Sequence, residues 1–224
     1  ENAFNFVFKS FKLVEGTRTE GEAWNHFALA VFYFDTKDFE NSRINYQRAA
    51  DIFTHLKHEY GLARATNGLG TVAIVQKRIT DALPLLEFAA NAFRKANHHA
   101  GLSRAVNDMG LLEKANRNYA NAITHLKESI ELRKDIEHIQ GLITSYTELG
   151  EIYLEQKDHT KALEQFEEGL KLSIQVKAHQ KQMRLHKLFY DTYKELKNTD
   201  LALQNFEKFF EIKSQLLSDE ASNN

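Results

Sequence analysis

Apolar residues recur along the chain at intervals of three and four positions, as in DALPLLEFAANAF (81–93) and KALEQFEEGLKLSI (161–174). This spacing places them on one face of an α-helix, and the strict alternation typical of a half-buried strand is absent. The 224 residues include a single proline, Pro84, and ten glycines, which is too few for an all-β protein with many tight turns. The pattern therefore predicts an all-α fold.

The helical pattern itself repeats every 40 residues without a gap, and GLARATNGLG (61–70), GLSRAVNDMG (101–110) and GLITSYTELG (141–150) are near copies. Each block predicts two helices joined by a polar turn. Small residues at the tenth and twenty-second positions, with large ones at the ninth and twenty-sixth, predict closely packed helix pairs. We expect an N-terminal helix within 1–20 that belongs to a preceding repeat or caps the first one, followed by five repeats at 21–60, 61–100, 101–140, 141–180 and 181–220.

Three kinds of single residue carry narrower expectations. The glycine that opens a block, such as Gly61, is expected to adopt positive φ where the preceding helix ends. Pro84 is expected in the first turn of its helix, where a missing N–H has no partner to lose. His58, His98 and His138 share one position of the block. Repeats are too far apart for these histidines to share a metal ion, and we interpret them as favoured by a helix C-terminus.

The motif L-G-x-x-Y followed by A-x-x-x-F appears as Leu149-Gly150-x-x-Tyr153 and Ala162-x-x-x-Phe166. In this motif the chain resembles the tetratricopeptide repeat (TPR) family over residues 21–217. The period of 40 and the missing first-helix Trp set it apart from the commonest form. The longer repeat is similar to those of kinesin light chain, the LGN-type polarity adaptors and the Rap-type bacterial peptide receptors. The resemblance implies a right-handed superhelical solenoid of antiparallel helix pairs, whose first helices line a concave groove.

Composition narrows the functional classes. The net charge is −2, from 29 basic and 31 acidic residues, which argues against a sequence-independent grip on nucleic acid. There is no cysteine, and no apolar run approaches the ~18 residues of a membrane span. Phosphate-binding loops, G-x-S-x-G and H-E-x-x-H motifs are absent, so we expect a non-catalytic, cytoplasmic protein without metal or cofactor.

The resemblance implies that the fourth, seventh, eighth and eleventh positions of each block face the groove. An Asn amide there matches the N–H and C=O of a peptide unit, and an Arg offers a fork for a carboxylate. Alternatively, Arg64 and Arg104 are solvated and pair with acidic residues of the next repeat. The candidate groove residues are Trp24, Phe27, Arg64, Asn67, Thr71, Arg104, Asn107, Asp108, Leu111, Thr144, Thr147, Glu151, Arg184 and Lys187.

These observations favour a module that binds an extended peptide or protein segment. The final repeat is similar to the last repeat of bacterial signalling proteins, so we expect the sensory or regulatory part of a larger protein. The chain starts at Glu1 and ends in the polar stretch SDEASNN, which we interpret as the limits of a fragment. The alternative is a constitutive assembly scaffold that has no ligand in its groove.

The last helix, expected at about 201–217, carries a different candidate surface. Its twenty-ninth block position holds Phe209, where earlier blocks have Ala49, Ala89, Ser129 and Gly169. A large ring there should end the solenoid. The apolar residues Phe206, Phe209, Phe210 and Leu217 are therefore expected either to cap the solenoid or to form an interface, as in a homodimer.

Overall fold

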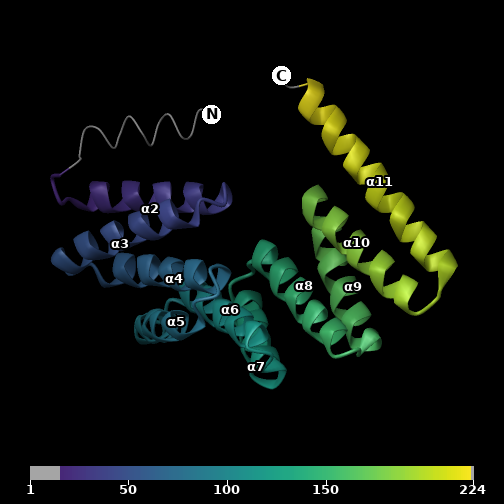
Figure 1. The fold of residues 1–224 in the computed structure, drawn as a ribbon, viewed down its shortest axis with the longest axis horizontal. Coiled ribbons are helices and arrows are strands. Elements are labelled where there is room, and N and C mark those ends of the chain that lie inside the picture. Colours follow the sequence, from purple (N-terminus) through teal and green to yellow (C-terminus); the bar gives the residue numbers. More distant parts are fainter. Residues whose placement is uncertain (1–15, 223–224) are drawn as a thin grey trace. The chain divides into compact units, whose positions relative to one another are not determined.

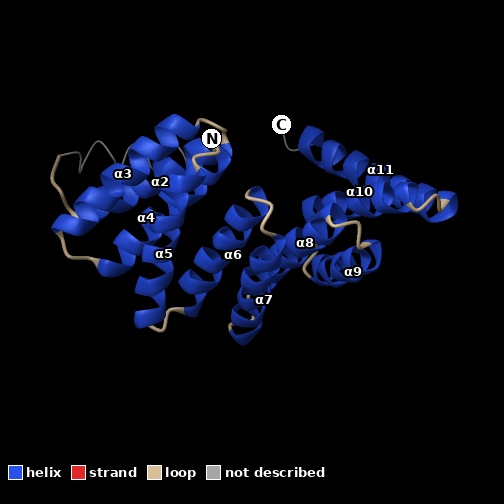
Figure 2. Cartoon of the chain, turned by 60° about the horizontal axis from the view of Figure 1, so that its bottom comes forward, coloured by secondary structure: helices blue, strands red, loops and turns tan. Residues whose placement is uncertain are grey.

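The computed structural model describes residues 16–222, with side chains as far as 218, and the helix expected before residue 16 lies outside this part. The described chain is helical throughout and contains no strand (Figures 1 and 2). Consecutive helices run antiparallel, as predicted. Their bounds are α2 Glu20–Asp35, α3 Phe39–His55, α4 Glu59–Val75, α5 Ile79–Lys95, α6 His99–Ala115, α7 Tyr119–Asp135, α8 Ile139–Glu155, α9 His159–Gln175, α10 His179–Glu195 and α11 Thr199–Ser222.

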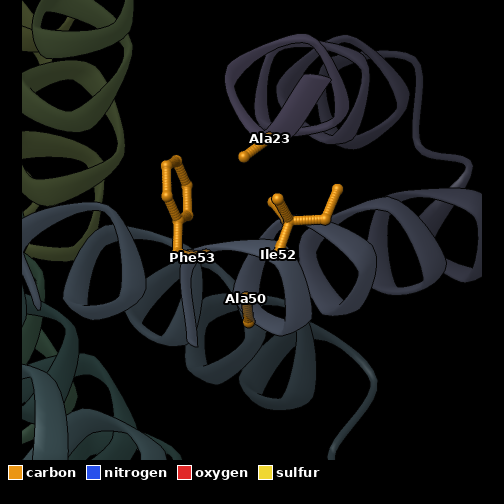
Figure 3. Close-up of a cluster of buried hydrophobic side chains, with 6 residues drawn as sticks. Ala23, Ala50, Ile52 and Phe53 are labelled. Atoms are coloured by element: carbon orange, nitrogen blue, oxygen red, sulfur yellow. The ribbon is translucent and has the colours of Figure 1, made fainter. Parts of the chain in front are cut away.

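The chain divides into two compact units, one up to His125 and one from Leu126, and we describe each by itself. In the first unit α3 packs on both α2 and α4, and α5 packs on both α4 and α6. Figure 3 shows part of the core between α2 and α3, where Ala23 faces Ile52 and Phe53. Ala23 and Phe53 are fully buried. In the second unit α9 packs on both α8 and α10, and α10 on α11.

The turns between helices share one geometry that recurs every 20 residues. In the turn after α3, the N–H of Lys57 donates to the carbonyl of Thr54 at 3.1 Å, and that of His58 donates to Phe53 at 2.9 Å. This pair of hydrogen bonds is a Schellman motif, which requires a residue with left-handed backbone conformation at its centre. That residue is never glycine here: the positive-φ positions are Lys37, Lys57, Lys77, Asn97, Arg117, Glu137, Lys157, Lys177 and Lys197.

The expectation that block-opening glycines adopt positive φ is therefore wrong. Gly61 and Gly101 lie inside α4 and α6, at the third residue of each helix. A Cβ atom added at Gly61 would lie 2.5 Å from Cδ1 of Phe53, and one at Gly101 would lie 2.5 Å from Cδ1 of Phe93. These glycines are needed because an aromatic ring of the preceding helix contacts the backbone.

Two other local expectations are also corrected. Pro84 is the sixth residue of α5 rather than part of its first turn, so the helix lacks the hydrogen bond that a residue there would donate to position 80. His58 and His98 begin helices instead of ending them. Each Nδ1 atom accepts the N–H of the glycine three residues later, Gly61 or Gly101, at 2.9 Å. This is an N-cap interaction, which neutral imidazole can make through its unprotonated nitrogen.

Candidate functional site

The candidate groove residues of the first unit surround a buried hydrogen-bond network between α4 and α6. Asn67 of α4 donates its Nδ2 to Oδ2 of Asp108 on α6 at 2.7 Å, and the hydroxyl of Thr71 donates to the same oxygen at 2.8 Å. The residues Asn67 and Asp108 are 4% and 8% exposed. Because an ionised carboxylate can only accept, Asp108 fixes which end of the Asn67 amide faces it.

This orientation leaves the side-chain oxygen of Asn67 as a hydrogen-bond acceptor without a donor. The Oδ1 atom of Asn67 is buried and has no hydrogen-bond partner among the described residues. Turning the amide over would satisfy this oxygen no better, because it would then face the Asp108 carboxylate. Leaving a buried polar atom unpaired costs ~1–3 kcal/mol, so such an atom usually has a partner that the protein alone does not supply.

Tyr46 of α3 packs its ring against Gly68 of α4, next in sequence to Asn67. A Cβ atom at Gly68 would lie 2.5 Å from Cε1 of Tyr46. Tyr46 is 7% exposed. Burial raises the pKa of Tyr46 to about 12, and the nearby charges of Arg104, Asp108 and Arg64 act on it in smaller measure. The phenol therefore stays neutral and contributes shape to the site rather than charge.

Arg64 is held over aromatic rings of α2. Its guanidinium carbon lies 4.5 Å from the ring centre of Phe27 and 5.4 Å from that of Trp24. The Trp24 indole is itself fixed by donating Nε1 to Glu20 at 2.9 Å. These cation–π contacts orient a positive charge without neutralising it.

Arg104 is exposed on α6 and lines the same cavity as Arg64. The cavity has a volume of about 150 Å³ and is also lined by Tyr60, Asn67 and the rings of Phe93 and His98. No carboxylate of the described residues lies within 4 Å of either guanidinium, so the ion pairs considered as an alternative are not formed there. The cavity is thus lined by two guanidiniums that have no carboxylate partner among the described residues, and by Asn67.

The other first-unit candidates are placed less favourably for contact with a ligand. Asn107 is 3% exposed, and Leu111 is half-buried. Residues that the sequence analysis did not select complete the site instead, namely Tyr46, Tyr60, Phe93 and His98. Tyr60 and His98 come shortly before the block-opening glycines Gly61 and Gly101, and Phe93 lies near the end of α5. None of them is at a position that the resemblance places in the groove. Their closeness in sequence to Gly61 and Gly101 was the one signal that could have identified them.

In the second unit the candidate residues are engaged with their neighbours. Arg184 pairs with Glu151, and Lys187 pairs with Asp191 at 2.6 Å. The Thr147 hydroxyl donates to the carbonyl of Ile143 at 2.7 Å, and Thr144 bonds to Gln140 and Lys181. Arg184 is therefore ion-paired with a residue of the preceding repeat, in contrast to Arg64 and Arg104 at the same block position.

The candidate residues of the last helix all lie on α11. Phe206 and Phe210 are 38% and 46% exposed, with ring centres 4.7 Å apart. Phe209 is half-buried, and Leu217 is exposed near the end of the helix. Lys213, which interrupts the apolar pattern, holds its Nζ 5.8 Å from the ring centre of Phe210.

The sequence profile of the tetratricopeptide repeat matches residues 61–135 and 102–175, which together span about half of the chain. The chain belongs to the tetratricopeptide repeat family. It is a TPR protein-binding module by family, and TPR folds are typically non-catalytic. No curated protein sequence matches it.

Among solved structures, this TPR chain is similar to BtubC (BKLC) from P. vanneervenii, with 16% identity, a TM-score of 0.77 and coverage of 96% of this chain and 89% of that one. It is also similar to a Rap protein complexed with Competence and Sporulation Factor, with 15% identity and a TM-score of 0.76. That match covers 97% of this chain and 70% of the Rap chain. A putative kinesin light chain from Podospora anserina is similar with 15% identity and a TM-score of 0.67. That match covers 88% of this chain and 98% of the other. At these identities the likeness concerns the fold alone, and it confirms the expected resemblance to kinesin-light-chain and Rap-type TPR folds.

Within the described residues, no helix is both long and apolar enough to cross a membrane. The same part of the chain contains no group of three or more His, Asp or Glu side chains placed to hold a metal ion.

Proposed function

We propose that the TPR chain binds an extended peptide segment of another protein across α4 and α6 of the first unit. One acidic side chain of the ligand would lie between Arg64 and Arg104, and a ligand N–H would bond to Oδ1 of Asn67. The single observation that carries this proposal is the buried, unpartnered Asn67 oxygen beside two guanidiniums that have no carboxylate partner among the described residues.

The polarity of the site follows from Asp108. Because one N–H of the Asn67 amide donates to Asp108, the amide is oriented with Oδ1 away from that carboxylate, and the ligand group that meets Oδ1 must donate. A backbone amide is such a donor, and every non-proline residue of an extended peptide carries one. The 150 Å³ cavity has room for about one side chain, so we expect a single anchoring residue here.

We further propose a sensory or regulatory role within a larger protein. Support comes from the fold of the Rap protein, whose structure contains Competence and Sporulation Factor. We also propose repeat boundaries at 21–60, 61–100, 101–140, 141–180 and 181–220. The helices that open the last four repeats begin at regular intervals, at Glu59, His99, Ile139 and His179.

A peptide library displayed on phage and selected on the purified protein tests the peptide-binding proposal. Calorimetric titration of the recovered peptides should show affinity reduced about 10- to 100-fold by Arg64→Gln or Arg104→Gln, since a charged hydrogen bond contributes ~1.5–3 kcal/mol. Arg184→Gln is the matched control because it occupies the same block position but pairs with Glu151. Peptides without acidic residues, or equal binding by all three variants, would reject the site.

Backbone N-methylation of the recovered peptide tests the polarity. One methylated position should abolish the bond to Asn67 and weaken binding to the wild type, whereas Asn67→Ala should bind the methylated and unmethylated peptides alike. If no single methylation distinguishes the wild type from Asn67→Ala, the assigned N–H bond is wrong even where the arginines matter.

A further inference from the structure

The last helix pair leaves open a position that the earlier pairs have covered. In the first unit, Leu112 of α6 packs on Ala82 and Leu86 of α5, which are fully buried. In the second unit, the Phe189 ring of α10 lies 5.8 Å from that of Phe166 on α9, which is also fully buried. The position equivalent to Leu86 and Phe166 on α11 is Phe206, and it is 38% exposed.

A cavity lies beside the exposed Phe206 ring. Between the C-terminal half of α10 and the N-terminal half of α11 lies a cavity of about 330 Å³, lined by Tyr190, Ala202, Leu203 and Phe206 with Lys194 and Lys197 (Figure 1 shows the two helices). The rings of Tyr190 and Phe206 are 5.2 Å apart. We call this cavity and its lining residues the α10–α11 pocket.

The charge of the α10–α11 pocket restricts what can occupy it. The Nζ of Lys194 lies 5.9 Å from the ring centre of Tyr190, and the same block position holds Phe34, Ile74, Lys114 and Leu154 in the earlier pairs. Neither Lys194 nor Lys197 has a carboxylate within 4 Å among the described residues, and the pocket lining contains no acidic side chain. An apolar occupant alone would place these ammonium groups in a less hydrated environment without compensation, so a complementary occupant carries carboxylates.

The size of the occupant is limited by Phe209. Ala49 and Ala89, at the same block position, are fully buried, and a Cβ atom at Gly169 would lie only 3.5 Å from Leu185 of the next helix. A phenylalanine ring at this point keeps a further TPR helix from packing along the whole of α11. The α10–α11 pocket, beside the first half of α11, remains accessible, which suits a short segment.

We propose that the α10–α11 pocket binds a short acidic segment of another protein, which packs one large apolar side chain against the joined rings of Tyr190 and Phe206 and places carboxylates against Lys194 and Lys197. This interaction is independent of the peptide site on α4 and α6, because it uses different residues in a different unit. The chemistry of the pocket, apolar walls with two unpaired cations, is what selects the partner.

The test uses three acetylated, amidated pentapeptides as probes, EEFEE, EEAEE and KKFKK, with NMR of the isotopically labelled protein. EEFEE should shift the methyl signals of Ala202 and Leu203 and bind at least tenfold more tightly than EEAEE. The double variant Lys194→Glu with Lys197→Glu should lose EEFEE and gain KKFKK. The control, Lys77→Glu with Lys177→Glu, changes the net charge equally at exposed turn residues and should bind EEFEE like the wild type.

Three results would overturn the proposal. The first is the absence of EEFEE-dependent shifts at Ala202 and Leu203. The second is binding of EEFEE that the charge reversal leaves unchanged, since the lysines would then play no part. The third is a wild-type dimer by light scattering that Phe206→Ser converts to a monomer, because a second copy of the chain, the homodimer considered from the sequence, would then occupy the pocket.

Discussion

At the residue scale, the absence of a side chain is what admits the large rings of this fold. Gly61 and Gly101 lie against Phe53 and Phe93, and Gly68 lies against Tyr46. Phe53 is fully buried, so its ring has no space into which it could withdraw. The equal spacing of glycine and phenylalanine in two successive blocks therefore reflects packing. A side chain added at either glycine should lower the free energy of unfolding.

Gly61→Ala should destabilise the protein by roughly 1–2 kcal/mol. Overpacking costs ~1–3 kcal/mol, and alanine recovers up to ~1 kcal/mol through its better helix propensity. Urea unfolding followed by circular dichroism measures the difference. Gly21→Ala is the control and should leave stability unchanged or slightly raised, since the nearest atom of the described residues to its added Cβ is Thr19 Oγ1 at 3.9 Å. A Gly61→Ala protein as stable as Gly21→Ala would contradict the packing account.

Tyr46 predicts a loss of stability in alkaline solution. Burial raises its pKa in the folded protein to about 12, above the ordinary value of 10.0. The unfolded chain therefore loses the phenol proton first as pH rises, and the stabilisation that is fully present below about pH 10 disappears between about pH 10 and 12. The effect should amount to about 2–3 kcal/mol.

Comparison of wild type with Tyr46→Phe isolates this effect, because the variant keeps the ring and lacks the titrating group. The urea midpoints of the two proteins should change differently between pH 9 and pH 11.5, with the wild type losing more. A parallel decline of both proteins would assign the alkaline effect to other groups.

At the element scale, the 17-residue helices α3 to α10 and their three-residue turns follow from two repeated devices. One is the Schellman turn with a left-handed residue at its centre, and the other is a side-chain cap at the next position, as at Asp38, His58 and Asp158. The apolar periodicity predicted the helices, because every turn of each helix contributes apolar residues to the same face. It could not predict the left-handed lysines, since lysine has no preference for that conformation.

Glu137→Gly should stabilise the chain by about 0.5–1 kcal/mol. Glu137 is exposed and has φ of 52°, a region that costs a residue with a Cβ atom energy and costs glycine none. Asn97, with φ of 51°, tolerates the same region better, so Asn97→Gly should gain less. Thermal unfolding of both variants measures the order. A larger gain at Asn97 would contradict the backbone explanation.

At the scale of the whole molecule, the repeat and the family could be predicted from the sequence, and the state of the candidate site only in part. The position of Arg64, Asn67 and Arg104 around one cavity follows from the repeat. That Asp108 takes up the Asn67 amide does not, because the two residues lie 41 positions apart, one more than the period. Nor could the sequence distinguish the paired Arg184 from the unpaired Arg64 at the same block position, because that difference depends on the neighbour facing each.

The uniform turns also bear on how the length of this protein can change. Lys57 and Asn97 occupy equivalent turns, and residues 61 and 101 are both glycines that receive a buried phenylalanine eight positions earlier. Excising 61–100 would join Tyr60 to Gly101 and present Phe53 to a glycine as before. Loss of this helix pair by recombination would thus preserve the turn and the contact of Phe53 with a glycine. It would also place Asp108 where Gly68 now receives the Tyr46 ring, so the packing there would have to change.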